Sequence, residues 1–431
     1  MTTSSTSAGN TFDVVVVGGG PAGSTVATLL TQGGLRVAVF ERESFPRFHI
    51  GESLLPANLP VFDRLGCHKA IRQAGFLRKP GATFYDDYEG RGCSTFTFQP
   101  APCQPAFAYN VVRAQFDDLL LRHAADAGAV VYRQHLVKQV QISADRVTVQ
   151  VHNAGGKRQE VHASLLVDAS GRATFLGSVL GKREPLPDLG KVALFAHYQG
   201  ARREPDIPDG NIRIHLLRDG WAWWIPFTNG LDSVGCVLHA KVVKQRQGSV
   251  EALFEEVLAS SRRLAEGLAG ARRMTPVHTA ANFSYRVTPA VGERYVATGD
   301  ASGFVDPIFS AGVFIAMRSA ELAASTILEA HRYRDFSARR LRPYEVRLRR
   351  GVAPFLALVR RYYEPAFLDL FFRPNPPLRL YRSVLWVLSG AAFDRRPWWL
   401  RSGLRLFFTS VTLRKARRWV SGLPVESRQR W

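Results

Sequence analysis

The stretch TFDVVVVGGGPAGSTVATLLTQGGLRVAVFERE, residues 11–43, decides the fold of this chain. Residues 13–17 predict a buried parallel strand, residues 24–32 a helix, and residues 36–40 a second strand. Residues 18–23, here called the glycine turn, connect the first strand to the helix. Because a strand–helix–strand unit of this length forms the core of doubly wound sheets, the stretch predicts a Rossmann-like α/β domain.

The glycine turn has the spacing that places a pyrophosphate at a helix N-terminus. Gly18 permits the tight turn, Gly20 lets backbone amides approach phosphates, and Gly23 lets the helix pack closely on the strand. Glu41 ends the second strand, where its carboxylate can accept hydrogen bonds from ribose hydroxyls and disfavours a 2′-phosphate. The sequence therefore predicts a dinucleotide site that includes Arg42, the residue after Glu41.

The composition suits a protein with a large core. The chain has 431 residues, of which 46% are hydrophobic and 22% charged, enough for one large or two to three ordinary domains. Its first ten residues lack the features of a signal peptide, and no apolar run approaches the roughly 18 residues that span a bilayer. The four cysteines have no metal-ligand spacing. We expect a cytoplasmic protein without a transmembrane segment, a disulfide framework or a metal site.

The net charge of +21 attracts anions, but it does not show which kind of anion the protein binds. Much of the charge lies late in the chain, at residues 332–350, 360–363 and 414–419, mixed with aromatic residues. Solvated arginines on amphipathic helices explain this pattern most simply, and an acidic protein partner is the alternative. No nucleic-acid-binding motif is present, so we expect no nucleic-acid partner.

Two later segments add residues to the dinucleotide site. LLVDASGR (165–172) and RYVATGDASGFVDP (294–307) each predict a strand followed by a turn. The order of the three segments resembles the FAD-dependent monooxygenase fold of the hydroxybenzoate hydroxylase type. The resemblance implies an FAD site, with the Gly-Asp pair at the ribityl–pyrophosphate region. The residues that it assigns from these segments are Asp168, Gly171, Gly299 and Asp300.

The same resemblance assigns one arginine. Arg113, in NVVRAQFDDLLLRHA, matches the family arginine that opens a helix beside the flavin, although charge pairing at a helix end would also explain it. No second glycine fingerprint for NAD(P)H is found. We therefore expect the FAD to be supplied reduced, as FADH2, by a separate flavin reductase.

GWAWWIPF, residues 220–227, concentrates three of the eight tryptophans. By itself it predicts a β-strand, because aromatic residues favour pleated surfaces. Trp221, Trp223, Ile225 and Pro226 also form W-x-W-x-I-P, here called the tryptophan motif, and this resembles the signature of flavin-dependent halogenases.

Three further stretches carry the same resemblance, in the order of the family. FPRFHIGESLLP (45–56), which contains Ser53, resembles the flavin-contacting loop. GFLRKPGATF (75–84) places Lys79 where the family has its catalytic lysine. FVDPIFSAG (304–312), here called the halide loop, fits F-x-x-P-x-x-S-x-G through Phe304, Pro307, Ser310 and Gly312.

The resemblance implies a specific chemistry. Reduced FAD, O2 and chloride or bromide would give hypohalous acid, with the halide held by backbone amides of Ser310, Ala311 and Gly312, since oriented N–H groups bind anions. Trp221 and Trp223 would separate flavin from substrate. Lys79 would hydrogen-bond the hypohalous acid or form a haloamine, and burial would favour amine chemistry. A solvent-exposed lysine would do neither.

One departure from the family bears on the substrate. Phe309 stands where the tryptophan-halogenating branch has a glutamate, so the carboxylate that helps attack on an unactivated ring is missing. The sequence therefore favours a small electron-rich aromatic substrate, a phenol or a pyrrole. It could be free or attached to an acidic acyl or peptidyl carrier protein. Glu52 is a weaker candidate for a base, because its motif is explained as a flavin loop.

The predicted organisation has three parts. An FAD-binding domain comprises residues 11–75, 105–183 and 290–333, and an antiparallel β-sheet domain on the substrate side comprises residues 76–104 and 184–289. Residues 334–431 form a C-terminal helical region, with one helix predicted at 352–372. We expect the substrate to enter between the sheet domain and these helices.

Other functions share the FAD motifs. An FAD-dependent monooxygenase that hydroxylates or epoxidises, or an oxidoreductase of the prenyl-reductase type, would have the same cofactor framework. Trp221, Trp223 and Ser310 favour halogenation over these functions. A flavin-binding protein without catalysis is disfavoured by Lys79.

Overall fold

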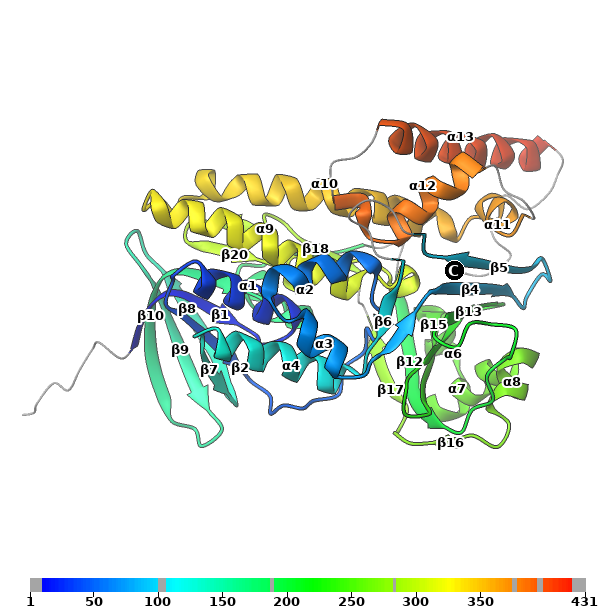
Figure 1. Ribbon diagram of the computed structural model, residues 1–431, viewed down its shortest axis with the longest axis horizontal. Coiled ribbons are helices and arrows are strands. Elements are labelled where there is room, and N and C mark those ends of the chain that lie inside the picture. The colour runs from blue at the N-terminus through cyan, green and yellow to red at the C-terminus, as the bar shows by residue number, and fades with distance from the viewer. Residues whose placement is uncertain are drawn as a thin grey trace, which may run out of the picture.

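Two large sheets form the scaffold of the protein (Figure 1). The computed structural model describes residues 10–99, 106–186, 190–281, 284–373, 378–393 and 398–420. Within these ranges the first sheet runs β19-β20-β10-β1-β2-β7, with β8 and β9 continuing from β10. Its strands are β1 (Thr11–Val17), β2 (Val37–Glu41), β7 (Val130–Arg133), β8 (His135–Ile142), β9 (Val147–Asn153), β10 (Arg158–Asp168), β19 (Val291–Gly292) and β20 (Tyr295–Ala297).

The first sheet confirms the predicted α/β fold. β1 pairs in parallel with β2 and β10, and β10 pairs in parallel with β20, so the carboxyl ends of these strands share one edge. Helices α1 (Pro21–Gln32) and α4 (Arg113–Asp126) pack on this sheet, and α9 (Gly312–Arg332) packs against α1. Helices α2 (Leu59–Leu65) and α3 (His68–Gln73) pack against these helices. α1 begins at Pro21 rather than at the predicted residue 24, because proline at the first helical position needs no hydrogen-bond acceptor.

The second sheet carries the tryptophan motif. It runs β16-β12-β15-β14-β13-β4-β5, with β17 beside β12. Its strands are β4 (Gly81–Asp86), β5 (Gly92–Thr97), β12 (Lys191–Gln199), β13 (Ile212–Leu217), β14 (Gly220–Pro226), β15 (Leu231–His239), β16 (Arg272–Arg273) and β17 (His278–Ala281). Its pairs are antiparallel except for β13 with β4. Helices α6 (Ala240–Gln245), α7 (Val250–Ala259) and α8 (Arg262–Leu268) lie beside this sheet (Figure 1).

Short strands and turns complete the region between the sheets. β3 (Leu77–Lys79) pairs with β6 (Ala108–Asn110), and β18 (Tyr285–Val287) pairs with β11 (Arg183–Pro185) and β21 (Gly303–Phe304). The remaining short elements are η2 (Pro56–Asn58), η3 (Gly171–Ala173), α5 (Phe175–Val179), η5 (Gly299–Ala301) and η6 (Pro307–Phe309).

The C-terminal helices differ from the prediction. α10 (Ala338–Tyr362) is followed by α11 (Pro365–Phe371), α12 (Leu378–Leu388), η7 (Ala391–Phe393) and α13 (Trp398–Val420). The single helix predicted at 352–372 is wrong, because the chain turns at 363–364 and Pro365 starts a new helix. Within the described residues, every helix is too short or too polar to cross a lipid bilayer.

The space between the second sheet and the C-terminal helices is filled with aromatic rings. Phe84 lies 4.9 Å from Phe371 between ring centroids, and Tyr362 lies 5.4 Å from Phe309. These rings belong to one buried cluster that also contains Trp221. Large apolar rings therefore pack against one another in the region where a substrate opening was expected.

Candidate functional site

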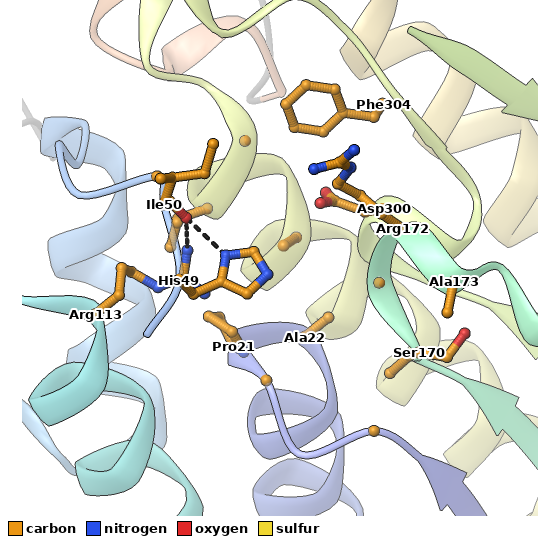
Figure 2. Close-up of a pocket in the computed structure, with 18 of the residues that line it drawn as sticks. Pro21, Ala22, His49, Ile50, Arg113, Ser170, Arg172, Ala173, Asp300 and Phe304 are labelled. Carbon is orange, nitrogen blue, oxygen red and sulfur yellow. Dashed lines mark hydrogen bonds between the residues drawn. The ribbon is translucent and has the colours of Figure 1, made fainter. Parts of the chain in front are cut away.

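A cavity of about 630 Å³ is lined by residues of both sheets. It begins at Gly18 and Gly20, passes the loop at residues 47–53, and ends at Trp221 and Trp223. Figure 2 shows side chains from several distant segments that point into this space. Its volume lies within the range of about 300–1,000 Å³ that is typical of sites for cofactors and small ligands.

The glycine turn has the geometry that its spacing predicts. Gly18 has φ of +101°, and a Cβ there would lie 2.5 Å from the carbonyl oxygen of Ala169. A Cβ at Gly23 would lie 1.9 Å from the carbonyl oxygen of Gly18, so only glycine allows α1 to pack at this distance. Gly20 lines the cavity, and a Cβ there would lie 3.4 Å from the Arg47 guanidinium.

Glu41 fixes the glycine turn from the end of β2. Its Oε2 accepts a hydrogen bond of 2.7 Å from the Gly19 amide, and its Oε1 accepts one of 2.8 Å from the Glu43 amide. Each carboxylate oxygen can accept a second bond, so Glu41 still has capacity for hydroxyl groups in the cavity. Arg42 also lines the cavity, but its side chain is largely exposed and pairs with Glu43.

Two helix N-termini converge on the cavity. α1 contributes Pro21 and Ala22, and α9 contributes Gly312 and Val313. The first-turn N–H groups of a helix have no intrahelical acceptor, and the helix dipole gives that end a partial positive charge. The cavity therefore favours anionic groups at two places, one beside the glycine turn and one beside the halide loop.

Arg113 makes the charge pairing that the sequence offered as one explanation, and it also lines the cavity. Its Nε and Nη2 donate hydrogen bonds of 2.7 and 2.8 Å to the carboxylate of Asp117, one turn along α4. Its Nη1 donates to the carbonyl oxygen of Ile50, toward which His49 Nδ1 also points (Figure 2). Arg113 therefore anchors the loop at residues 47–53 while it lines the cavity. Burial, with Arg113 nearby, lowers the pKa of His49 to about 4, so this imidazole is neutral.

Asp168 lies outside the cavity. Its carboxylate accepts hydrogen bonds from the amides of Ser170 and Leu176, at 3.0 and 2.7 Å, and so holds the turn in which Gly171 lines the cavity. The sequence assigned Asp168 to the cofactor, whereas Ser170 and Gly171, and not Asp168, line the cavity.

Asp300 does line the cavity, opposite Arg113 (Figure 2). Burial raises the pKa of Asp300 to about 6, against the lowering effects of Arg113 and Arg172. Gly299 does not line the cavity; a Cβ there would lie 2.8 Å from that of Ala22. The glycine therefore lets Asp300 approach the start of α1.

The three clustered tryptophans lie on two faces of their sheet. The Trp221 and Trp223 rings line the cavity with centroids 5.9 Å apart, and Trp223 Nε1 donates a 3.1 Å hydrogen bond to Ser233 Oγ. Trp224 lies on the opposite face, where its Nε1 donates a 2.8 Å bond to Asp232. Only two of the three clustered tryptophans can therefore contact a ligand in the cavity.

Substitutions at two glycines test whether Trp223 faces the cavity and Trp224 faces away from it. A Cβ at Gly235 would lie 2.2 Å from the Trp223 ring, and a Cβ at Gly267 would lie 2.5 Å from the Trp224 ring. We expect Gly235→Ala to push Trp223 into the cavity and weaken FAD binding about tenfold, whereas Gly267→Ala should lower stability by about 1–3 kcal/mol without changing FAD affinity. FAD titration and thermal unfolding of both variants measure these effects. Equal FAD affinities would contradict the assignment of Trp223 to the cavity wall.

Lys79 is buried, with 1% of its surface exposed. Its Nζ donates hydrogen bonds of 2.8 Å to Ser53 Oγ and 3.1 Å to the Leu54 carbonyl oxygen. Burial lowers the pKa of Lys79 to about 7. Ser53 lines the cavity and Lys79 does not, so the amine lies directly behind the wall that Ser53 forms.

The halide loop bends at Ser310, which has φ of +55° and lines the cavity with Pro307 and Gly312. The Ser310 amide donates a 2.9 Å hydrogen bond to the Pro307 carbonyl oxygen, so this N–H is already engaged. Ala311 lines a second cavity of about 300 Å³, which shares Asp300, Phe304 and Gly312 with the first. The structure thus directs Ser310 and Gly312, but not Ala311, toward the main cavity.

A buried carboxylate–imidazole pair was not predicted from the sequence. Glu52 Oε1 lies 2.7 Å from His197 Nε2, and Glu52 lines the cavity. Glu52 was considered as a base, but no local pattern marks His197, which reaches Glu52 only through the register of β12. Across the described part of the chain, no cluster of histidine, cysteine, aspartate and glutamate residues is arranged to hold a metal ion.

Comparison with known proteins identifies relatives that match most of the length of this chain. Residues 11–349 match the family model described as an FAD binding domain. The 1H-pyrrole-2-carbonyl-(peptidyl-carrier protein) chlorinase of Pseudomonas fluorescens is 33% identical, over 89% of this chain and 90% of that protein. The corresponding brominase of Pseudoalteromonas luteoviolacea is also 33% identical, over 90% and 94%. The solved structure of the myxobacterial chondrochloren halogenase CndH is 31% identical with a TM-score of 0.78, over 93% of this chain and 97% of that one.

Proposed function

The chain belongs to the flavin-dependent halogenases, and from this premise we propose that it uses reduced FAD, O2 and chloride or bromide to halogenate an electron-rich pyrrole or phenol. The observation that carries the proposal is the placement of Lys79. A buried amine with a pKa of about 7 lies behind Ser53, at the wall of a cavity that ends at Trp221 and Trp223.

The cavity residues fit FAD. The space above Gly20, which a side chain would fill, and the N-terminus of α1 suit the pyrophosphate, and Glu41 suits the ribose. Arg113 and Asp300 suit the ribityl region, while Ser53 and Pro307 suit the ring. The remaining residues proposed to contact the cofactor are Gly18, Arg42 and Gly171. Bound in reduced form, as supplied by a separate flavin reductase, FAD provides the electrons that convert O2 and halide into hypohalous acid.

We assign the halide to the start of α9. Gly312 opens this helix, and its N–H group together with the helix dipole can hold an anion at the edge of the cavity. Ser310 lines the cavity beside it, and its hydroxyl group can donate a further hydrogen bond. The Trp221 and Trp223 rings keep a substrate from the flavin side of the cavity, so that the oxidised halogen, rather than oxygen, reaches it.

Lys79 then transfers the halogen. With a pKa of about 7, a large part of the amine is neutral near pH 7, and its lone pair can attack the halogen of hypohalous acid to give an N–halogen bond and water. The protonated part can instead donate a hydrogen bond that makes hypohalous acid more electrophilic. Ser53 and the Leu54 carbonyl orient the amine in either case.

The proposed substrate is a ring that donates its own electrons. Phe309 is packed against Tyr362 and supplies no carboxylate to stabilise a cationic ring intermediate. Two relatives are named for a pyrrole attached to a peptidyl carrier protein. We extend this substrate class to the present chain, with an acidic carrier drawn by the net charge of +21.

Product analysis tests the proposal. The purified chain with a flavin reductase, FAD, O2 and mixed chloride and bromide is expected to add halogen to a carrier-tethered pyrrole or to a member of a phenol panel, as read by mass spectrometry. Without the reductase, NADPH should be oxidised only slowly. Oxygenated products that form without any halide would instead support the hydroxylase function.

A further inference from the structure

Four side chains, one of them from the halide loop, meet in the interior of the protein. They are Lys191 at the start of β12, Trp221 in β14, Asp306 before η6, and Tyr363 at the end of α10. Trp221 Nε1 donates a 3.2 Å hydrogen bond to the Tyr363 hydroxyl, which donates one of 2.7 Å to Asp306 Oδ2. Lys191 Nζ lies 3.5 Å from the same Asp306 oxygen.

Asp306 is the member of this cluster that belongs to the halide loop. Its Oδ1 accepts a 3.0 Å hydrogen bond from the Ile308 amide and so caps η6. Its Oδ2 is the oxygen held by Tyr363 and Lys191. Asp306 and Lys191 are both more than nine-tenths buried, where electrostatic interactions are stronger than at the surface.

We propose that Asp306 is a positioning residue for the halide site, and that Lys191 and Tyr363 set its place. The proposal rests on the halide assignment made above. Because Tyr363 caps the C-terminus of α10 and also contacts Trp221, the cluster links the halide loop, the tryptophan strand β14 and α10. Through this cluster α10 has a function in halide binding, although this helix contributes none of the residues that line the main cavity.

The protonation of Tyr363 supports this arrangement. Burial and the nearby Asp306 raise the pKa of Tyr363 well above its usual value, so the hydroxyl keeps its proton and donates to the carboxylate. Burial lowers the pKa of Lys191 to about 8, against the raising effect of Asp306. Lys191 therefore carries its charge at neutral pH and serves as the counter-ion of Asp306.

Neighbouring tyrosines provide a matched test. Tyr363→Phe removes the hydroxyl that holds Asp306, whereas Tyr362→Phe removes a buried hydroxyl that has no hydrogen-bond partner in the described structure. We expect Tyr363→Phe to raise the KM for bromide about fivefold, the value of one ordinary hydrogen bond, with little change in kcat or in FAD affinity. Tyr362→Phe should leave the bromide KM unchanged.

Asp306→Asn should have a larger effect. The amide can still cap η6, but Lys191 loses its counter-ion, and a displacement of the halide site by about 1 Å would lower kcat/KM for bromide about 10²-fold. If this variant does not fold, the comparison of bromide KM between Tyr363→Phe and Tyr362→Phe still tests the inference. Equal bromide KM values for Tyr363→Phe and Tyr362→Phe would overturn the inference. Failure of the unmodified protein to halogenate any substrate at saturating bromide would instead refute the proposed function.

Discussion

Lys79→Met is expected to lower the rate of halogenated product formation by about 10²- to 10⁴-fold, the usual contribution of a positioned proton-transfer or nucleophilic group. The side chain lies behind Ser53 and outside the lining of the cavity, so FAD affinity and reoxidation of reduced FAD should stay near normal. Stopped-flow reoxidation and product analysis on the same sample separate the two effects. Efficient halogenation by Lys79→Met would show that another residue, or free hypohalous acid, transfers the halogen.

The pH profile distinguishes the two forms of the amine. If the neutral amine reacts, the transfer rate should rise with pH through about 7 and then level off, because the lone pair becomes available above the pKa. If the protonated amine acts by hydrogen bonding, the rate should fall over the same interval. We expect the rise. Lys79→Arg provides the control, since a guanidinium keeps the charge but does not deprotonate, and it should be nearly inactive at every pH.

The same pKa shift has a consequence for stability. Folding lowers the pKa of Lys79 from 10.5 to about 7, so the unfolded chain binds more protons between these values. The burial of Lys79 therefore costs stability as pH falls from about 10.5 to about 7, and the cost levels off below 7. Lys79→Met should be more stable than the unmodified protein at pH 7 in equilibrium unfolding, although it has lost activity.

Gly23→Ala is expected to abolish FAD binding. Its Cβ would lie 1.9 Å from the Gly18 carbonyl oxygen, so α1 must move away from β1 and the glycine turn must open. Overpacking of this kind costs about 1–3 kcal/mol or more, which exceeds the gain of about 1 kcal/mol from alanine in a helix. Thermal unfolding and FAD titration should both show a loss.

Gly20→Ala is the matched control for this loss. Gly20 has φ of −71°, which alanine adopts freely, and its Cβ would meet only the Arg47 side chain at 3.4 Å. We expect this variant to fold normally but to bind FAD about tenfold more weakly, since the methyl group projects into the cavity. Normal FAD affinity in Gly23→Ala would refute the steric account of the turn.

The sequence determined the features that depend on local sterics and periodicity. Gly18 must turn at positive φ and Gly23 must lack a side chain, whatever surrounds them, so their spacing predicted the α/β fold and its cofactor cavity. The alternation in residues 220–226 likewise predicted the strand β14. The C-terminal helices were predicted less well, because proline is tolerated inside α10 at two positions and a local pattern could not show which proline breaks a helix.

Only the tertiary structure decided the chemistry of the side chains. The register of β14 against β15 places Trp223 over Gly235, toward the cavity, and turns Trp224 away. The pKa of Lys79 depends on burial against Ser53 and Leu54, twenty-five or more residues away in the chain. Asp306 meets its partners only after three distant segments fold together. Hydrogen bonds and desolvation depend on distances between such segments, and a linear sequence fixes those distances only through the complete fold.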